Sequence, residues 1–60
     1  MIRKGDLLKV RGRLALAESE LFIKYSHLHG SWNNHVKVIF TDNGVTAVVS
    51  MVGGEVQKLS

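Results

Sequence analysis

The dipeptide Asn43-Gly44 lies between two apolar runs and restricts the fold more than any other feature of the sequence. Both residue types tolerate the positive φ angles that a tight type I′ turn requires. Residues 36–41, on one side, alternate with a period of two and present a strongly apolar face, as strands do. On the other side, Val45–Val52 is β-branched and apolar on both faces, which predicts a central strand or one covered by another subunit. The sequence therefore predicts a β-hairpin that turns at Asn43-Gly44.

Gly53-Gly54 predicts a further tight turn, after which Glu55–Leu59 alternates as a short final strand. Charges on this strand would discourage pairing with a foreign sheet edge. The C-terminal half is thus predicted to be a three-stranded meander. The polar stretch His27–His35 contains glycine and two asparagines, and we expect a loop there that leads into the strand at Val36.

The segment Asp6–Leu16 has the pattern of one half-buried strand. In an extended chain, residues two apart point to the same side. One side would carry Leu8, Val10, Leu14 and Leu16, and the other Lys9, Arg11 and Arg13. We therefore expect an apolar inner face and a basic outer face over this segment.

The stretch Leu14–Leu28 fits two structures. As a hairpin, the chain would turn at Ala17–Glu20 and return as a strand over Leu21–Tyr25, which has high β propensity. As a helix over about 15–28, it would place apolar residues three and four apart. The hairpin leads to a mainly β fold, a five-stranded small barrel or a twisted meander sheet. The helix leads to an α+β fold of the order β-α-β-β-β.

The chain has 60 residues and no cysteine, so we expect one small domain over residues 1–60 without disulfides or thiolate zinc sites. Residues 1–6 are basic and run into Asp6 rather than into a long apolar segment, and no export signal is expected. The longest apolar run, Val45–Val52, is far shorter than the roughly 20 residues of a membrane helix. We expect a cytoplasmic protein.

Lys4-Gly5-Asp6 followed by the alternating Leu7–Val10 and then Gly12 resembles the opening strand of SH3-like small β-barrels, including the KOW-type modules of ribosomal and transcription proteins. The resemblance covers Lys4–Gly12, and the chain departs from the KOW pattern in lacking a second glycine soon after Gly12. It implies a five-stranded SH3-like barrel that binds nucleic acid or protein through its loops and an exposed face.

The basic residues near the N-terminus are the leading candidate binding site. Alternate residues on a strand lie roughly 7 Å apart, close to the phosphate spacing of one nucleic-acid strand. The net charge of +3 also favours anionic partners. The candidate contacts to nucleic acid or another polyanion are Arg3, Lys4, Lys9, Arg11, Arg13 and Trp32. The alternatives are that the cations only form the solvated outer face of a strand, and that Trp32 folds back onto the core.

Other chemistry has weaker support. His27, His29 and His35 could together ligate a metal ion, but no acidic ligand lies beside them in the sequence, and exposed loop histidines are the simpler reading. Glu18 and Glu20 form a carboxylate pair, although no nucleophile and base can be placed around them. We therefore expect a non-enzymatic binding module with no metal and no cofactor.

The strand Val45–Val52 has more apolar surface than one small core easily covers. A homo-oligomer formed through this strand would hide that surface and add stability, and a closed barrel would do the same within one chain. The alternative function is accordingly a protein-interaction or inhibitory module that uses an apolar surface and the His27–His35 loop.

Overall fold

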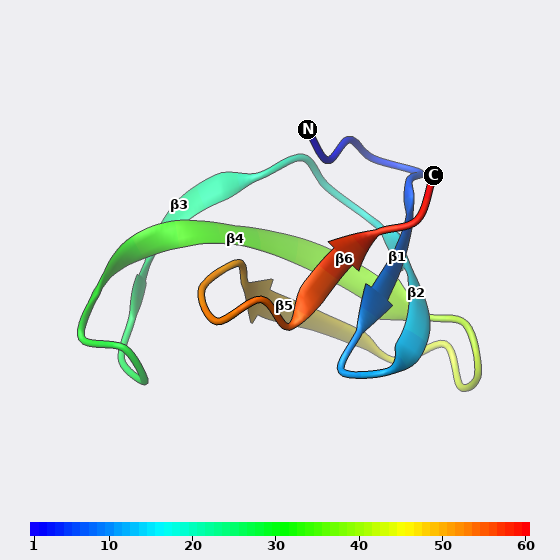
Figure 1. Cartoon of the computed structure of the whole chain (residues 1–60). Coiled ribbons are helices and arrows are strands. Elements are labelled where there is room, and N and C mark those ends of the chain that lie inside the picture. Colours follow the sequence, from blue (N-terminus) through cyan, green and yellow to red (C-terminus); the bar gives the residue numbers. More distant parts are fainter.

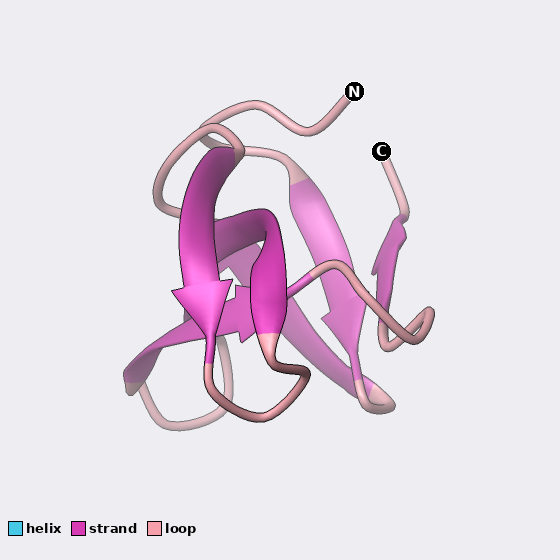
Figure 2. Ribbon diagram, turned by 90° about the vertical axis from the view of Figure 1, so that its left-hand side faces the viewer, coloured by secondary structure: helices cyan, strands magenta, loops and turns pink.

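Six antiparallel β-strands and no helix make up the computed structural model, which describes residues 1–60 (Figure 1). The strands are Leu7–Val10 (β1), Arg13–Ala17 (β2), Phe22–Ser26 (β3), Ser31–Phe40 (β4), Thr46–Ser50 (β5) and Val56–Lys58 (β6). They form one sheet that curls into a half-barrel, as the turned view in Figure 2 shows. The mainly β prediction is confirmed, whereas the helix over about 15–28 is wrong. None of the segments is a helix that could span a bilayer.

A tight turn at Arg11-Gly12 divides the segment that the sequence suggested was one strand. Their φ angles are 50° and 81°, and Val10 pairs directly with Arg13. Positive φ at both central residues defines a two-residue type I′ hairpin. The prediction of one extended strand over Asp6–Leu16 is therefore wrong, because the chain reverses halfway and the inward positions change parity after the turn.

Strands β2 and β3 run one after the other along the same side of β4. His35 pairs with Phe22 of β3 and Val38 pairs with Ala17 of β2, while β5 lies on the opposite side of β4, paired with His35–Ile39. The link over 18–21 also bonds to β4, since the Glu18 N–H donates to the Lys37 carbonyl oxygen at 2.7 Å. A strand over Leu21–Tyr25 was expected and is present as β3, but the predicted hairpin between β2 and β3 does not form.

The β3–β4 hairpin closes with a short turn over 27–30. There the Gly30 N–H donates to the Ser26 carbonyl oxygen at 2.7 Å, and Gly30 takes a positive φ of 67°. The long loop predicted over His27–His35 is therefore wrong, because β4 already begins at Ser31. Cross-strand pairing of Trp32 with Tyr25 shows why: large aromatic residues stabilise neighbouring strands even when polar residues surround them.

The predicted hairpin between β4 and β5 is present, but its loop is longer than two residues. It spans residues 41–45, and Gly44 is the loop residue with a positive φ, at 71°. The Asn43 side chain accepts a hydrogen bond from the Val45 N–H at 3.0 Å, so Asn43 shapes the loop through its side chain rather than through a positive φ.

Strand β6 pairs with β1 and not with β5. Gly53 and Gly54, both with positive φ, carry the chain from β5 across to the first hairpin. There the Arg11 N–H donates to the Glu55 carbonyl oxygen at 3.0 Å. The predicted C-terminal meander is therefore wrong at its last strand, and β5 is an edge strand rather than a central one.

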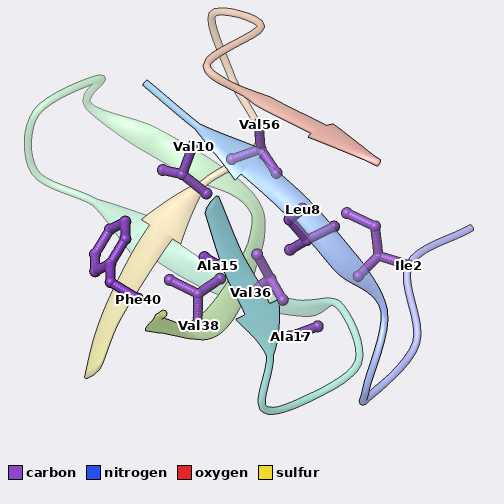
Figure 3. Packing of buried hydrophobic residues seen from close by; sticks show 9 residues of the cluster. All are labelled: Ile2, Leu8, Val10, Ala15, Ala17, Val36, Val38, Phe40 and Val56. Atoms are coloured by element: carbon purple, nitrogen blue, oxygen red, sulfur yellow. The ribbon is translucent and has the colours of Figure 1, made fainter. Parts of the chain in front are cut away.

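The core lies on the concave face of the curled sheet (Figure 3). Its nine members are Ile2, Leu8, Val10, Ala15, Ala17, Val36, Val38, Phe40 and Val56. Leu14 and Leu16 were expected in this core, but they are exposed on the convex face because the Arg11-Gly12 turn reverses the alternation. On that face Leu16 pairs with Leu7 in β1 and with Ile39 in β4. We call Leu7, Leu14, Leu16 and Ile39 the outer apolar patch.

Candidate nucleic-acid interface

The cations predicted to form one basic stripe lie in three different settings. Lys9 pairs with Leu14, and cross-strand partners share a face, so Lys9 lies on the convex side. Arg13 pairs with the buried Val10 and lies at the rim of the concave side. Arg11 is in the turn between them. The continuous stripe is a wrong prediction, because it depended on an unbroken strand.

Arg13 is held by contacts within the protein. Its guanidinium donates from Nη2 to Asp42 Oδ1 at 2.8 Å and from Nε to Asp42 Oδ2 at 3.3 Å. The same group lies 4.0 Å from the centroid of the Phe40 ring. These hydrogen bonds lower the pKa of Asp42 below its usual value. Arg13 therefore covers one end of the core and is the cation least free to contact a ligand.

Arg3 and Lys4 are exposed in the segment before β1, at the end of the strand away from the Arg11 turn. The Arg3 N–H donates to Asp6 Oδ2 at 2.8 Å, and Lys58 Nζ lies 3.3 Å from the same oxygen. Both contacts lower the pKa of Asp6, the first more strongly. These two candidate residues are separated from Arg11 by the length of β1.

Arg11 occupies a position where several hollows of the surface meet. Its guanidinium forms an ion pair with Glu55 at 3.2 Å, and both side chains are well exposed. Exposed ion pairs contribute little and exchange partners readily. Arg11 and Lys9 together line a polar hollow of about 260 Å³ between the two glycine turns. Of the predicted cations, Lys9 and Arg11 thus share this hollow, while Arg11 and Arg13 line another one together.

A second hollow, of about 290 Å³, lies between the β3–β4 hairpin and β5. Figure 1 shows that this hairpin extends past the end of β5. We call the hollow the histidine groove. Its charged and titratable lining residues are Arg11, Lys24, Tyr25, His27, His29, His35 and Glu55. The groove therefore contains two permanent cations, Arg11 and Lys24, and one carboxylate, Glu55, which forms an ion pair with Arg11.

His35 is the buried histidine of the groove. Its Nδ1 lies 2.9 Å from the Asn33 carbonyl oxygen, and its ring stacks on Phe22 with centroids 6.2 Å apart. Because a carbonyl oxygen only accepts, Nδ1 carries the proton, and Nε2 is the nitrogen left for a ligand. His35 is therefore fixed in orientation, whereas His27 and His29 are exposed near the hairpin turn.

Trp32 is on β4 near this turn and not in a loop, and its side chain is 69% exposed. It therefore does not fold back onto the core. Its ring meets Tyr25 edge to face at 5.6 Å, and Tyr25 meets His27 in the same manner at 5.1 Å. Tyr25 thus connects the exposed indole to the wall of the histidine groove.

The other candidate groups do not come together. No set of three His, Asp or Glu side chains is close enough to hold one metal ion, so His27, His29 and His35 do not form the metal site that their spacing allowed. Glu18 and Glu20 are exposed on the link between β2 and β3.

Lys24 is the groove residue that the sequence interpretation missed. It lies on β3 within the run Lys24–His29, which combines basic, aromatic and histidine side chains over six residues. That local composition is the signal that would have identified it. Its partner across the groove, Arg11, is distant in sequence and comes near only through the fold.

Comparison of the chain with protein-family models, with curated proteins and with solved structures finds no match in any of the three. The histidine groove and the fold around it must therefore be interpreted from their own chemistry.

Proposed function

We propose that this protein is a non-enzymatic binding module that holds nucleic acid or another polyanion in the histidine groove. The observation that carries the proposal is the groove lining, where Arg11, Lys24 and three histidines surround one hollow. Phosphates bound by cationic side chains release condensed counterions, which makes such grooves favourable sites for polyanions.

The conformation of Arg11 supports this proposal. It is the one residue other than glycine with a positive φ, a conformation that costs an ordinary L-residue about 1–2 kcal/mol. Asn or Gly would fit the first position of this turn better. Strained residues are common at functional sites, and here the strained backbone places the Arg11 side chain where three hollows of the surface meet.

Lys9 extends the basic surface from the groove around Arg11, because it shares the neighbouring polar hollow. Arg3 and Lys4 add long-range attraction to an anion from the opposite end of β1, as does the net charge of +3. Arg13 contributes least, since its guanidinium is already bound to Asp42. The proposed interface therefore centres on Arg11 and Lys24, with Lys9 at its margin.

We also infer that the fold is of the SH3-like small-barrel class and that the protein acts in the cytoplasm. The antiparallel curled sheet, in which the last strand lies beside the first, is compatible with such a barrel. The Lys4–Gly12 resemblance points the same way. A barrel fold permits many functions, so the groove and not the fold carries the functional proposal.

The test is a comparison of two neutralised lysines. Lys24→Gln removes a cation from the groove, and the control Lys37→Gln removes one from an exposed β4 position outside the groove lining. We expect Lys24→Gln to weaken binding of a fluorescent oligonucleotide and to lower the slope of log affinity against log salt by about 0.7–0.9. Equal effects of the two substitutions on affinity and slope would refute the groove as the site.

A second candidate function is self-association or protein binding through apolar surface, and the free edge of β5 favours it. The Phe40 N–H bonds to the Val45 carbonyl oxygen, and the Met51 N–H to the Asn34 carbonyl oxygen. In an antiparallel pair, hydrogen-bonded residue pairs alternate with non-hydrogen-bonded ones. The backbone N–H and C=O groups of Thr46, Val48 and Ser50 therefore point away from β4.

The β5 edge carries no charged residue, unlike β3 with Lys24 and β6 with Lys58. Charged residues protect sheet edges from pairing with other chains, so β5 is the unprotected edge. A second copy could pair its β5 antiparallel with this edge, with Val48 opposite Val48. Thr46 would then lie opposite Ser50 of that copy, and no like charges would be in contact. The outer apolar patch offers a further contact of the same salt-insensitive kind.

A further inference from the structure

The β3–β4 hairpin exposes large apolar side chains that take no part in the core. Ile23 is 63% exposed and Trp32 69% exposed, and Leu28 at the turn is more exposed still. Tyr25 contacts the Trp32 ring and, like Leu28, lines the histidine groove. A group of exposed apolar residues next to a charged groove is typical of a binding surface rather than of random surface composition.

The ring geometry leaves an aromatic surface open beside the cationic hollow. Trp32 and Tyr25 are cross-strand partners, and their planes meet at 73°. An edge-to-face pair uses the edge of one ring, so the strongly exposed indole keeps a face free for a planar ligand. His27 packs against Tyr25 at 76° and continues this row of rings into the groove lining.

We propose that Trp32, supported by Tyr25, stacks an unpaired base of single-stranded nucleic acid whose phosphates lie in the histidine groove. This inference rests on the proposed function and adds the class of ligand. Charge complementarity places the phosphates beside Arg11 and Lys24. Tyr25 follows Lys24 on β3 and pairs with Trp32 across the hairpin, which brings a base of the same strand within reach of the indole. Proteins that bind single strands combine these two elements, a positive groove and aromatic platforms.

Duplexes fit this surface less well. Bases in a duplex are stacked on one another and offer no free face to Trp32, so a duplex would gain only the electrostatic part of the binding. A base-free polyanion such as inorganic polyphosphate would likewise use the groove alone. The three ligands thus separate stacking from charge.

Trp32 is the single tryptophan of the chain, so its fluorescence reports this site directly. We expect oligo(dT) to quench the Trp32 emission and polyphosphate to bind with little change in it. Trp32→Ala should weaken oligo(dT) binding about tenfold to a hundredfold and leave polyphosphate affinity within twofold. Trp32→Tyr should recover part of the lost affinity, because it restores a ring.

The matched control is Ile23→Ala, which removes exposed apolar surface from the same hairpin without removing a ring. It should alter oligo(dT) affinity less than twofold. The stacking proposal is overturned if oligo(dT) leaves the emission unchanged, if a duplex of the same length binds more tightly, or if Trp32→Ala weakens both ligands equally. Failure of every polyanion to bind would instead refute the groove and the stacking together.

Discussion

Arg13 and Asp42 form a two-point contact, with Nη2 2.8 Å from Oδ1 and Nε 3.3 Å from Oδ2, that joins the start of β2 to the β4–β5 loop. The same guanidinium covers the Phe40 ring at 4.0 Å. Arg13, which the sequence predicted to contact a ligand, is therefore part of the fold. We expect its contact with Asp42 to contribute to the stability of the protein and to the pH dependence of that stability.

Acid should destabilise the protein through Asp42 and Asp6, whose carboxyl pKa values both lie below the ordinary 3.8. A depressed folded-state pKa stabilises the protein where the unfolded carboxyl is ionised, and this stabilisation is lost as the pH falls. We expect the free energy of unfolding to decrease between about pH 5 and pH 2. Urea denaturation across this range measures it.

The double variant Asp6→Asn, Asp42→Asn should be less stable at neutral pH and should show a flatter pH dependence. Glu18→Gln is the control, because Glu18 forms no ion pair. If the double variant kept the full wild-type decrease, these two carboxylates would not be its source.

Arg11→Asn should change stability and binding in opposite directions. Asn adopts the positive φ of a type I′ turn with less strain, so the variant should be more stable by up to about 1 kcal/mol. The exposed Arg11–Glu55 ion pair that it loses is worth little. Polyanion affinity should fall, because the groove loses a permanent cation. Thermal denaturation and anisotropy titrations measure the two effects, and a variant both less stable and equally tight in binding would contradict this account.

Leu8→Ala and Leu14→Ala make the same chemical change on opposite faces of one hairpin. Leu8 is 0% exposed, and Leu14 is 49% exposed. Leu8→Ala should cost about 2–5 kcal/mol and unfold much of the protein, because a core of this size supplies only about 3–5 kcal/mol. Leu14→Ala should stay within about 0.5 kcal/mol of the wild type. Similar losses in chemical denaturation would mean that both leucines are in the core.

The two leucines also show what limited the sequence interpretation. Alternation correctly placed Leu8 and Val10 inside. It wrongly placed Leu14 and Leu16 with them, because the turn at Arg11-Gly12 was not predicted. The turn at Asn43-Gly44 was predicted, since tight turns favour these residue types. An arginine with positive φ goes against that preference, so local propensity alone does not reveal it.

The candidate site was less predictable than the fold. Strand positions follow from local alternation, but the pairing of β6 with β1 joins residues from opposite ends of the chain. The histidine groove likewise combines Arg11, Lys24 and Val48 from three distant segments. Local sequence patterns do not predict that these three residues lie close together, because their proximity depends on how strongly the sheet curls.

Self-association through β5 is tested with charge at Val48, which is 46% exposed on the strand with the free edge. In the proposed pairing two Val48 side chains meet, so Val48→Lys and Val48→Glu should each sediment as monomers of 6.7 kDa. An equimolar mixture of the two should associate, because opposite charges then face each other.

Leu59→Lys, which adds the same charge beyond β6, is the control and should associate like the wild type. Hydrogen exchange at the Thr46, Val48 and Ser50 amides should slow as the concentration of the wild-type protein rises. Rapid exchange at every concentration, with a monomeric wild type, would exclude the β5 pairing.

The most direct measurement of the groove is an NMR titration of the ¹⁵N-labelled protein with oligo(dT) at low salt. We expect the largest amide shift changes at Arg11, Lys24 and His27, and we expect added salt to reverse them. Changes that centre on Leu14 and Leu16 in the outer apolar patch and persist at high salt would contradict this expectation.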